Sequence, residues 1–175
     1  MITKALPHYS YEDYRQWEGD WELIEGMPYA MAPSPLSDHQ YAIVQIVSQV
    51  SPQLEGCKKN CYIFTELDWI IEKDTVLRPD VAVICKRVED YIKSPPEVIF
   101  EVVSKATSQK DEYLKFQLYE REKVPFYVLV YPELKKARIF RLKGKRYNKI
   151  ADCTDQTFEF ETGCRFRVNF GKIWY

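Results

Sequence analysis

Two acidic residues stand in apolar segments of the chain. Asp80 directly precedes the apolar run 81–84, at the start of an expected buried strand, and Glu101 lies inside the apolar run 98–103. An unpaired buried carboxylate costs several kcal/mol or takes a raised pKa, and two such groups side by side repel each other. A divalent cation removes both costs, and Mg²⁺, or Mn²⁺ in its place, prefers such oxygen ligands. The pair predicts a metal site; alternatively each acid has a basic partner, such as Arg78 for Asp80, or ends its strand in solvent.

A lysine on the following helix is placed to complete such a site. Asp111 and Lys115 are four residues apart in the helix expected over residues 108–122, so their side chains share one helix face, which Tyr119 continues. A lysine beside two metal-bound acids can hold the attacking water or stabilise charge that develops at a phosphorus. From the spacing alone, the favoured interpretation is a surface Asp111–Lys115 ion pair worth about a few tenths of a kcal/mol.

The elements that must position these residues follow from periodicity and turn residues. A helix begins at the N-cap Ser10, a hairpin turns at Gly26, and a second helix ends at Gly56. The expected segments, in order, are helix 10–18, strands 21–25 and 27–32, helix 39–54, strands 61–71, 76–84 and 97–103, helix 108–122, strand 124–130, and a β-rich remainder. This order predicts a single α/β (α+β) domain over residues 1–175, with a mixed central sheet flanked by helices, an N-terminal hairpin and a C-terminal β-rich extension.

Composition favours a water-soluble protein without a membrane or secretion segment. Hydrophobic residues make up 46% and charged residues 29% of the chain, an ordinary balance for a globular domain. No stretch approaches the roughly 20 apolar residues of a membrane helix. The N-terminal residues contain no apolar run typical of a secretion signal, so we expect a cytoplasmic protein.

The five cysteines are Cys57, Cys61, Cys85, Cys153 and Cys164. An odd number at irregular spacing, without an export signal, favours reduced thiols over a disulfide framework. Cys57 and Cys61 have the spacing of one half of a zinc site, but no second Cys or His pair follows at suitable spacing. The sequence therefore favours cysteines without structural zinc.

A basic tract follows the last strong strand. Its charges alternate with Ile139, Phe140, Leu142 and Tyr147, a pattern typical of an edge hairpin turning at Gly144. The basic residues are Lys135, Lys136, Arg138, Arg141, Lys143, Lys145, Arg146 and Lys149. Because the net charge of the chain is −1, a nucleic-acid surface must come from such local clustering. The tract is either a phosphate-binding face or a solvated edge whose lysines discourage aggregation.

Several motifs occur together in an order that resembles the Uma2 family, a branch of the PD-(D/E)XK nuclease superfamily. They are Trp21-Glu-Leu-Ile-Glu-Gly26, Met31-Ala-Pro-Ser-Pro35 with His39, Arg78-Pro-Asp-Val-Ala-Val83 and Glu101-Val-Val-Ser104, followed by Asp111, Lys115, Tyr119 and the strand 124–130. The resemblance covers roughly residues 10–142. It implies a restriction-endonuclease-like core with a mixed sheet flanked by helices.

The resemblance also implies roles for particular residues. Asp80 and Glu101 match the first and second acid of the superfamily, and the backbone carbonyl of Val102 matches a further metal ligand. Val103 stands where the superfamily usually has a lysine, and Lys115 matches the lysine that the family supplies from the next helix. Two further positions match the family: Glu22, implied to orient a metal-bound water, and His39, implied to contact phosphate or transfer a proton. For His39 the alternative is a helix-start residue that bonds to a backbone carbonyl.

These residues predict an Mg²⁺-dependent endonuclease that hydrolyses DNA phosphodiester bonds. The superfamily often acts as dimers, so a homodimer is a further expectation. The competing hypothesis is a nuclease-like fold that binds nucleic acid or a protein without cutting, which the near-neutral charge and Val103 favour.

Overall fold

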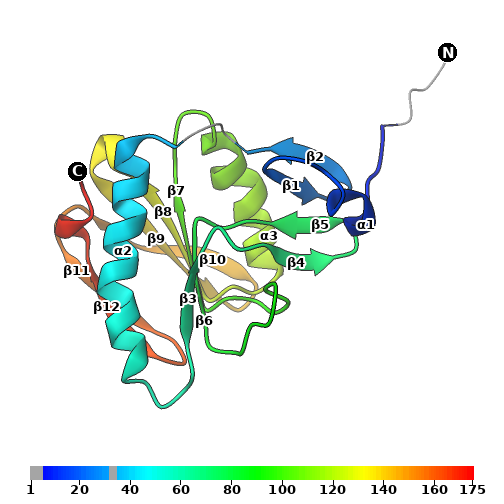
Figure 1. The fold of residues 1–175 in the computed structure, drawn as a ribbon. Helices are drawn as coiled ribbons and strands as arrows, with labels where there is room; N and C mark the ends of the chain where they lie inside the picture. Colours follow the sequence, from blue (N-terminus) through cyan, green and yellow to red (C-terminus); the bar gives the residue numbers. More distant parts are fainter. Residues whose placement is uncertain (1–5, 32–34) are drawn as a thin grey trace.

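A six-stranded central sheet forms the middle of the molecule (Figure 1). The computed structural model describes residues 6–31 and 35–175. The strands, in the order β10-β9-β8-β7-β6-β3, are β3 (Tyr62–Thr65), β6 (Val81–Ile84), β7 (Val98–Val102), β8 (Phe126–Tyr131), β9 (Lys136–Lys143) and β10 (Arg146–Cys153). Strands β7 and β8 run parallel and the other neighbours run antiparallel. The predicted mixed central sheet is therefore confirmed.

Both faces of this sheet are covered. One face packs against α2 (Ser37–Glu55) and the two-stranded sheet of β11 (Thr157–Glu161) and β12 (Arg165–Asn169); the other packs against a helical region made of a π-helical segment η1 (Lys110–Lys115) and α3 (Phe116–Arg121). Along β7, Phe100 and Val102 pack in the core between the sheet and α2, while Ile99 and the following Val103 pack in the core between the sheet and α3. This alternation explains why β7 is apolar on both sides.

A second sheet carries the N-terminal hairpin. Its strands, in the order β2-β1-β5-β4, are β1 (Trp21–Ile24), β2 (Met27–Ala30), β4 (Trp69–Glu72) and β5 (Thr75–Leu77). The short helix α1 (Tyr11–Tyr14) precedes it, and Ser10 and Asp13 form the reciprocal cap expected of that sequence. The predicted hairpin turn lies at Glu25 and Gly26, both with positive φ. The end of the second predicted strand at residue 32, and the N-terminal residues 1–5, lie outside the described residues.

The two long strands predicted over residues 61–71 and 76–84 are wrong as single elements. Each divides into one strand of the central sheet and one strand of the N-terminal sheet. In the first the chain turns at Glu66, whose φ is +51°, and in the second it turns at Arg78 and Pro79, where proline cannot donate to a ladder. Asp80 therefore lies where the chain enters the central sheet.

The cysteines differ from the prediction. Cys57 is joined to Cys164, and Cys61 to Cys85, by disulfides, so the expectation of reduced thiols is wrong for these four residues in the structure. The remaining cysteine, Cys153, is a buried free thiol. The sequence prediction failed because cysteines distant in sequence lie together at one end of the folded sheet.

Within the part of the chain that the structure describes, no helix has the length and apolar character needed to cross a membrane.

Candidate active site

Strand register brings the two predicted acids together. Val81 of β6 pairs with Phe100 of β7, so the next opposed pair is Asp80 and Glu101. Opposed residues on neighbouring strands point to the same face of a sheet, here the face covered by α3. The side chains are buried, with 8% of Asp80 and 1% of Glu101 exposed. The structure thus places two carboxylates side by side in a nearly dry environment.

One oxygen of each acid is held by strong hydrogen bonds and the other is not. Asp80 Oδ2 accepts a 2.6 Å bond from the backbone amide of Val102. Glu101 Oε1 accepts bonds from Lys115 Nζ at 2.9 Å and from the Tyr119 hydroxyl at 2.7 Å. Among the described residues, Asp80 Oδ1 and Glu101 Oε2 have no donor closer than 3.5 Å. These two oxygens are the ones free to bind a cation.

Arg78 does not neutralise Asp80. Its guanidinium lies 2.7 Å from Asp68 Oδ1 and 2.7 Å from Asp20 Oδ1, which fixes the N-terminal sheet beside the site. In the described structure the basic group that faces Asp80 is His39. The alternative in which Arg78 accounts for the buried Asp80 is therefore wrong.

Lys115 is buried and does not form a surface ion pair. Its ammonium lies 2.9 Å from Glu101 Oε1, 2.9 Å from Glu22 Oε1 and 3.7 Å from Asp111 Oδ1, and only 2% of the residue is exposed. The predicted contact with Asp111 exists, but it belongs to a buried network. Lys115 therefore connects the helix to both the central sheet and the N-terminal hairpin.

Lys110 is a site residue that the sequence analysis missed. Its ammonium bonds to Glu22 Oε2, on the same carboxylate that Lys115 contacts. The two lysines are five residues apart, which an α-helix would place on different faces. The segment Lys110–Lys115 is π-helical, and its i to i+5 bonding brings residues five apart onto one face. The five-residue spacing of the two lysines is the signal that the sequence offers, and it indicates a shared helix face only if the segment is π-helical.

Glu22 is the most deeply buried acid of the site, with none of its surface exposed. It comes from β1 and accepts bonds from both lysines and from the backbone amide of Arg78 at 2.8 Å. Burial would raise the pKa of Glu22, but Lys115 and Lys110 outweigh it and hold that pKa below the usual value. Glu22 is thus an ionised anchor for the two lysines.

Charge is not balanced within this network. Three carboxylates, those of Glu22, Glu101 and Asp111, contact the ammonium groups of Lys110 and Lys115, and the carboxylate of Asp80 faces His39. With all four carboxylates and both lysines ionised and His39 neutral, the network has two excess negative charges. Burial raises the pKa of Glu101 well above its usual value. Lys115 lowers this pKa but does not outweigh burial, and the nearby Asp80 raises it further. Burial would lower the pKa of Lys115, but Glu101 and Glu22 hold it well above its usual value. The site would gain from a further cation.

His39 reaches the site from α2, on the opposite face of the sheet. Its Nε2 lies 3.6 Å from Asp80 Oδ1, and the side chain is 17% exposed. Burial lowers the pKa of His39, but the contacts with Asp80 and with the Val102 backbone reverse this and raise it. The backbone contact matches the structural alternative for His39, and the Asp80 contact places it beside the acids, so both interpretations stay open.

The donor set fits Mg²⁺ or Mn²⁺. Asp80 and Glu101 supply two hard oxygens, and Mg²⁺ typically takes one or two carboxylates and completes its shell with water and substrate phosphate. Within the described residues, no three carboxylate or imidazole groups converge closely enough to enclose an ion here. Such an ion would be held by Asp80 and Glu101, with Val102 as the predicted backbone ligand, and would keep open positions.

The basic tract forms the predicted edge hairpin. Strands β9 and β10 pair from Lys143 and Arg146, and the turn between them begins at Gly144 with φ +61°. Three cations share Asp152: Lys136 at 3.4 Å, Arg138 at 3.1 Å and Lys149 at 3.1 Å. Other members have different partners or are exposed: Arg146 lies 3.3 Å from Glu120, Arg141 stacks over the Phe126 ring at 5.4 Å, and Lys135, Lys143 and Lys145 are exposed. Two carboxylates, those of Asp152 and Glu120, thus face four of the eight basic residues, so the hairpin keeps a net positive charge.

Comparison with known proteins bears on the family and the fold of the chain. The family model Uma2, described as "Putative restriction endonuclease", matches residues 11–161. A solved structure, a "putative nuclease belonging to DUF820 from Anabaena variabilis ATCC 29413", superimposes with a TM-score of 0.78 over 95% of this chain and 97% of that chain, at 14% identity. This likeness shows a shared fold. No curated protein matches the chain. Because the family model spans most of the sequence, the chain belongs to the Uma2 family.

Proposed function

We propose that the protein is a metal-dependent endonuclease that hydrolyses DNA phosphodiester bonds at the Asp80–Glu101 site. The observation that carries this proposal is the buried carboxylate pair, in which one oxygen of each acid has no donor closer than 3.5 Å, within a network that has more carboxylates than ammonium groups. A divalent cation complements that arrangement, and when bound it would activate a water and neutralise phosphate charge. Membership in a family described as restriction endonucleases supports the same reaction class.

The residues of the chain have separate tasks in this proposal. Asp80 and Glu101 hold the metal, and Tyr119 fixes the orientation of the Glu101 carboxylate through its 2.7 Å bond. Lys115 has three N–H donors, of which two serve Glu101 and Glu22, while the third has only the 3.7 Å contact with Asp111. That third donor is available to the attacking water or to a phosphate oxygen.

Substrate would approach from the less buried side of the network. The side chains of His39 and Lys110 are 17% and 15% exposed, whereas Glu22 and Lys115 are almost fully enclosed. His39 and Lys110 are thus the members placed to meet a phosphate group. Glu22 lies on the enclosed side of the network, where its carboxylate contacts the ammonium groups of both lysines.

The test is cleavage of double- and single-stranded DNA with Mg²⁺ or Mn²⁺, using Asp80→Asn and Glu101→Gln beside the wild type. We expect cleavage by the wild type only with metal, and a loss on the order of 10²-fold or more in either variant. Asp155→Asn and Glu161→Gln, exposed residues of the same types, should cleave normally. Equal cleavage by wild type and both site variants would disprove the assignment. If calorimetry detects no Mn²⁺ binding while DNA still binds, the chain is a non-cleaving nucleic-acid-binding fold.

A further inference from the structure

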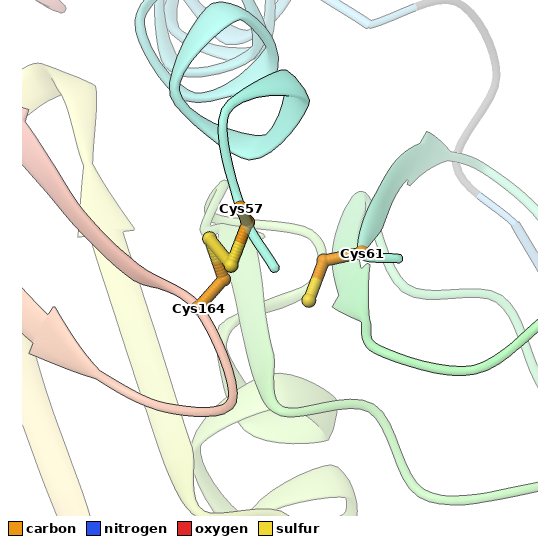
Figure 2. Close-up of side chains that lie close together, drawn as sticks. All are labelled: Cys57, Cys61 and Cys164. Atoms are coloured by element: carbon orange, nitrogen blue, oxygen red, sulfur yellow. A yellow bond between two sulfur atoms is a disulfide. The ribbon is translucent and has the colours of Figure 1, made fainter. Parts of the chain in front are cut away.

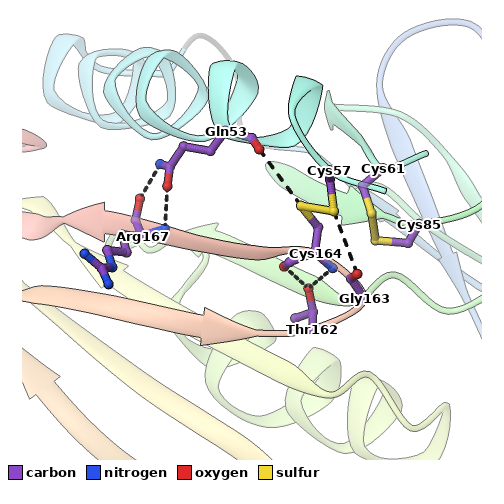
Figure 3. Close-up of a disulfide and its surroundings, with 8 residues drawn as sticks. All are labelled: Gln53, Cys57, Cys61, Cys85, Thr162, Gly163, Cys164 and Arg167. Carbon is purple, nitrogen blue, oxygen red and sulfur yellow. Dashed lines mark hydrogen bonds between the residues drawn. A yellow bond between two sulfur atoms is a disulfide. The ribbon is translucent and has the colours of Figure 1, made fainter. Parts of the chain in front are cut away.

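Four cysteines from four separate segments converge at the end of the central sheet opposite Asp80 along β6. Cys57 follows the end of α2, Cys61 precedes β3, Cys85 follows β6, and Cys164 lies in the turn between β11 and β12. The sulfurs of Cys57, Cys61 and Cys164 all lie within 4.8 Å of one another (Figure 2). Cys85 is bonded to Cys61, so its sulfur lies next to this group of three (Figure 3).

This proximity is more than two disulfides require. Cys57 and Cys164 form one pair and Cys61 belongs to the other, yet their sulfurs are in mutual contact range. Two independent disulfides do not require contact between the sulfurs of one pair and those of the other. Four thiolates around one Zn²⁺ must do so, because Zn–S bonds of about 2.3 Å place tetrahedral sulfurs roughly 3.8 Å apart. The sulfurs of Cys57, Cys61 and Cys164 therefore have a spacing that suits three ligands of a thiolate site, and Cys85, bonded to Cys61, is the candidate for the fourth.

The surrounding backbone keeps the cluster together independently of the sulfurs. The side chain of Gln53 on α2 bonds to the backbone of Arg167 on β12 at 2.8 and 2.9 Å, which holds strand β12 against the helix (Figure 3). Gly163 lets this turn approach the other pair, since a Cβ at that position would lie 3.3 Å from Cys85 Sγ and 3.2 Å from Lys59 Cδ. A side chain at this position would therefore push the turn or Cys85 away by a few tenths of an ångström.

Spacing and charge also fit zinc. Cys57 and Cys61 are separated by three residues, within the usual two to four for a zinc-binding pair. The missing second pair is Cys85 and Cys164, which are too distant in sequence to be recognised as one. A tetrathiolate zinc centre carries two negative charges, and basic residues adjoin the cysteines in sequence: Lys58, Lys59, Lys86 and Arg165. Cys61 and Cys164 are buried, and Cys57 and Cys85 are half-buried.

We propose that Cys57, Cys61, Cys85 and Cys164, once reduced, bind one structural Zn²⁺ that fastens the β11–β12 hairpin to the ends of α2 and β6. Reduction of the two disulfides takes four electrons and four protons from a thiol reductant, such as glutathione or a dithiol, which is itself oxidised to its disulfide, and gives four protein thiols. Zinc binding then releases those four protons. This site is independent of the proposed nuclease site.

The experiment is zinc analysis of the full chain purified with a thiol reductant, supplied with Zn²⁺ and then dialysed. We expect about one zinc per chain, with X-ray absorption showing four sulfur ligands at about 2.3 Å. Cys164→Ser and Cys61→Ser should lose most of the zinc, whereas Cys153→Ser, at the buried free cysteine outside the cluster, should keep it. Asp80→Asn should also keep it, which separates this site from the carboxylates.

Because a cysteine substitution can prevent folding, the wild type provides a second test. Titration of the folded protein with a mercurial should release one zinc in step with modification of the four thiols. A reduced, folded wild type that contains no zinc after this treatment would overturn the proposal. Zinc bound by oxygen or nitrogen ligands, or zinc lost in Asp80→Asn and kept in Cys164→Ser, would overturn it as well.

Discussion

The buried acid–lysine network and the basic edge hairpin lie on one row of the central sheet. Glu101 on β7 is opposed by Leu129 on β8, which is opposed by Arg138 on β9. Two strand spacings, roughly 10 Å, separate Glu101 from Arg138. At the first position the charges are enclosed, and at the second Arg138 shares a half-exposed Asp152 with Lys136 and Lys149.

The comparison shows how burial determines what a charge does. In the enclosed network Glu22, Glu101 and Asp111 are shielded from solvent, so the ammonium groups that contact them are needed for the fold and their removal is costly. On the hairpin, solvent and salt screen each pair, which then contributes little to stability. The buried charges therefore define the site, while the exposed charges are free to take part in binding.

The largest effect is expected from Lys115→Met. The methionine fills similar space but leaves Glu22 and Glu101 without the ammonium that contacts both at 2.9 Å. We expect a loss of about 3–5 kcal/mol in the free energy of unfolding, measured by urea denaturation. Adding Glu101→Gln should restore part of this loss, because it removes one of the unpaired charges. A single variant as stable as the wild type would show that the network does not depend on Lys115.

A smaller effect is expected from Tyr119→Phe. It removes only the hydroxyl that donates to the buried Glu101 at 2.7 Å, so the free energy of unfolding should fall by about 1.5–3 kcal/mol. The matched control is Tyr131→Phe, whose hydroxyl donates at 2.8 Å to Glu112 in a half-buried setting, and whose effect should be smaller. Equal decreases in the two variants would contradict the role of burial.

The same contrast explains what the sequence could predict of the site. An acidic residue beside or within an apolar strand can be recognised from the sequence alone, so Asp80 and Glu101 could be identified as candidates before their partners were known. The mixed sheet was predictable because β7 and β8 are strongly apolar runs. Lys115 was identifiable chiefly through the family resemblance, because its spacing from Asp111 also suits a surface pair.

Other features depend on tertiary packing that no local pattern encodes. Lys110 joins the site only because the helix has π geometry, which the period of an α-helix conceals. The breaks at Glu66 and Arg78 divide expected strands between two sheets, and they depend on how the sheets pack. The cysteine cluster was missed for a similar reason, since Cys164 comes close to Cys57 and Cys61 only in the folded chain.

The smallest effect is expected for the exposed basic hairpin of β9 and β10, in the salt dependence of DNA binding. Lys143 and Lys145 are exposed at its tip, whereas Lys149 lies 3.1 Å from Asp152. If the hairpin binds DNA phosphates, Lys143→Gln and Lys145→Gln should each reduce the slope of log affinity against log salt by about 0.9 for every phosphate that is no longer neutralised. Lys149→Gln, the matched control, should change it less, because that ammonium already has a carboxylate partner. Affinity titrations over a range of salt concentrations measure these slopes, and an unchanged slope in both tip variants would leave the hairpin as a solvated sheet edge.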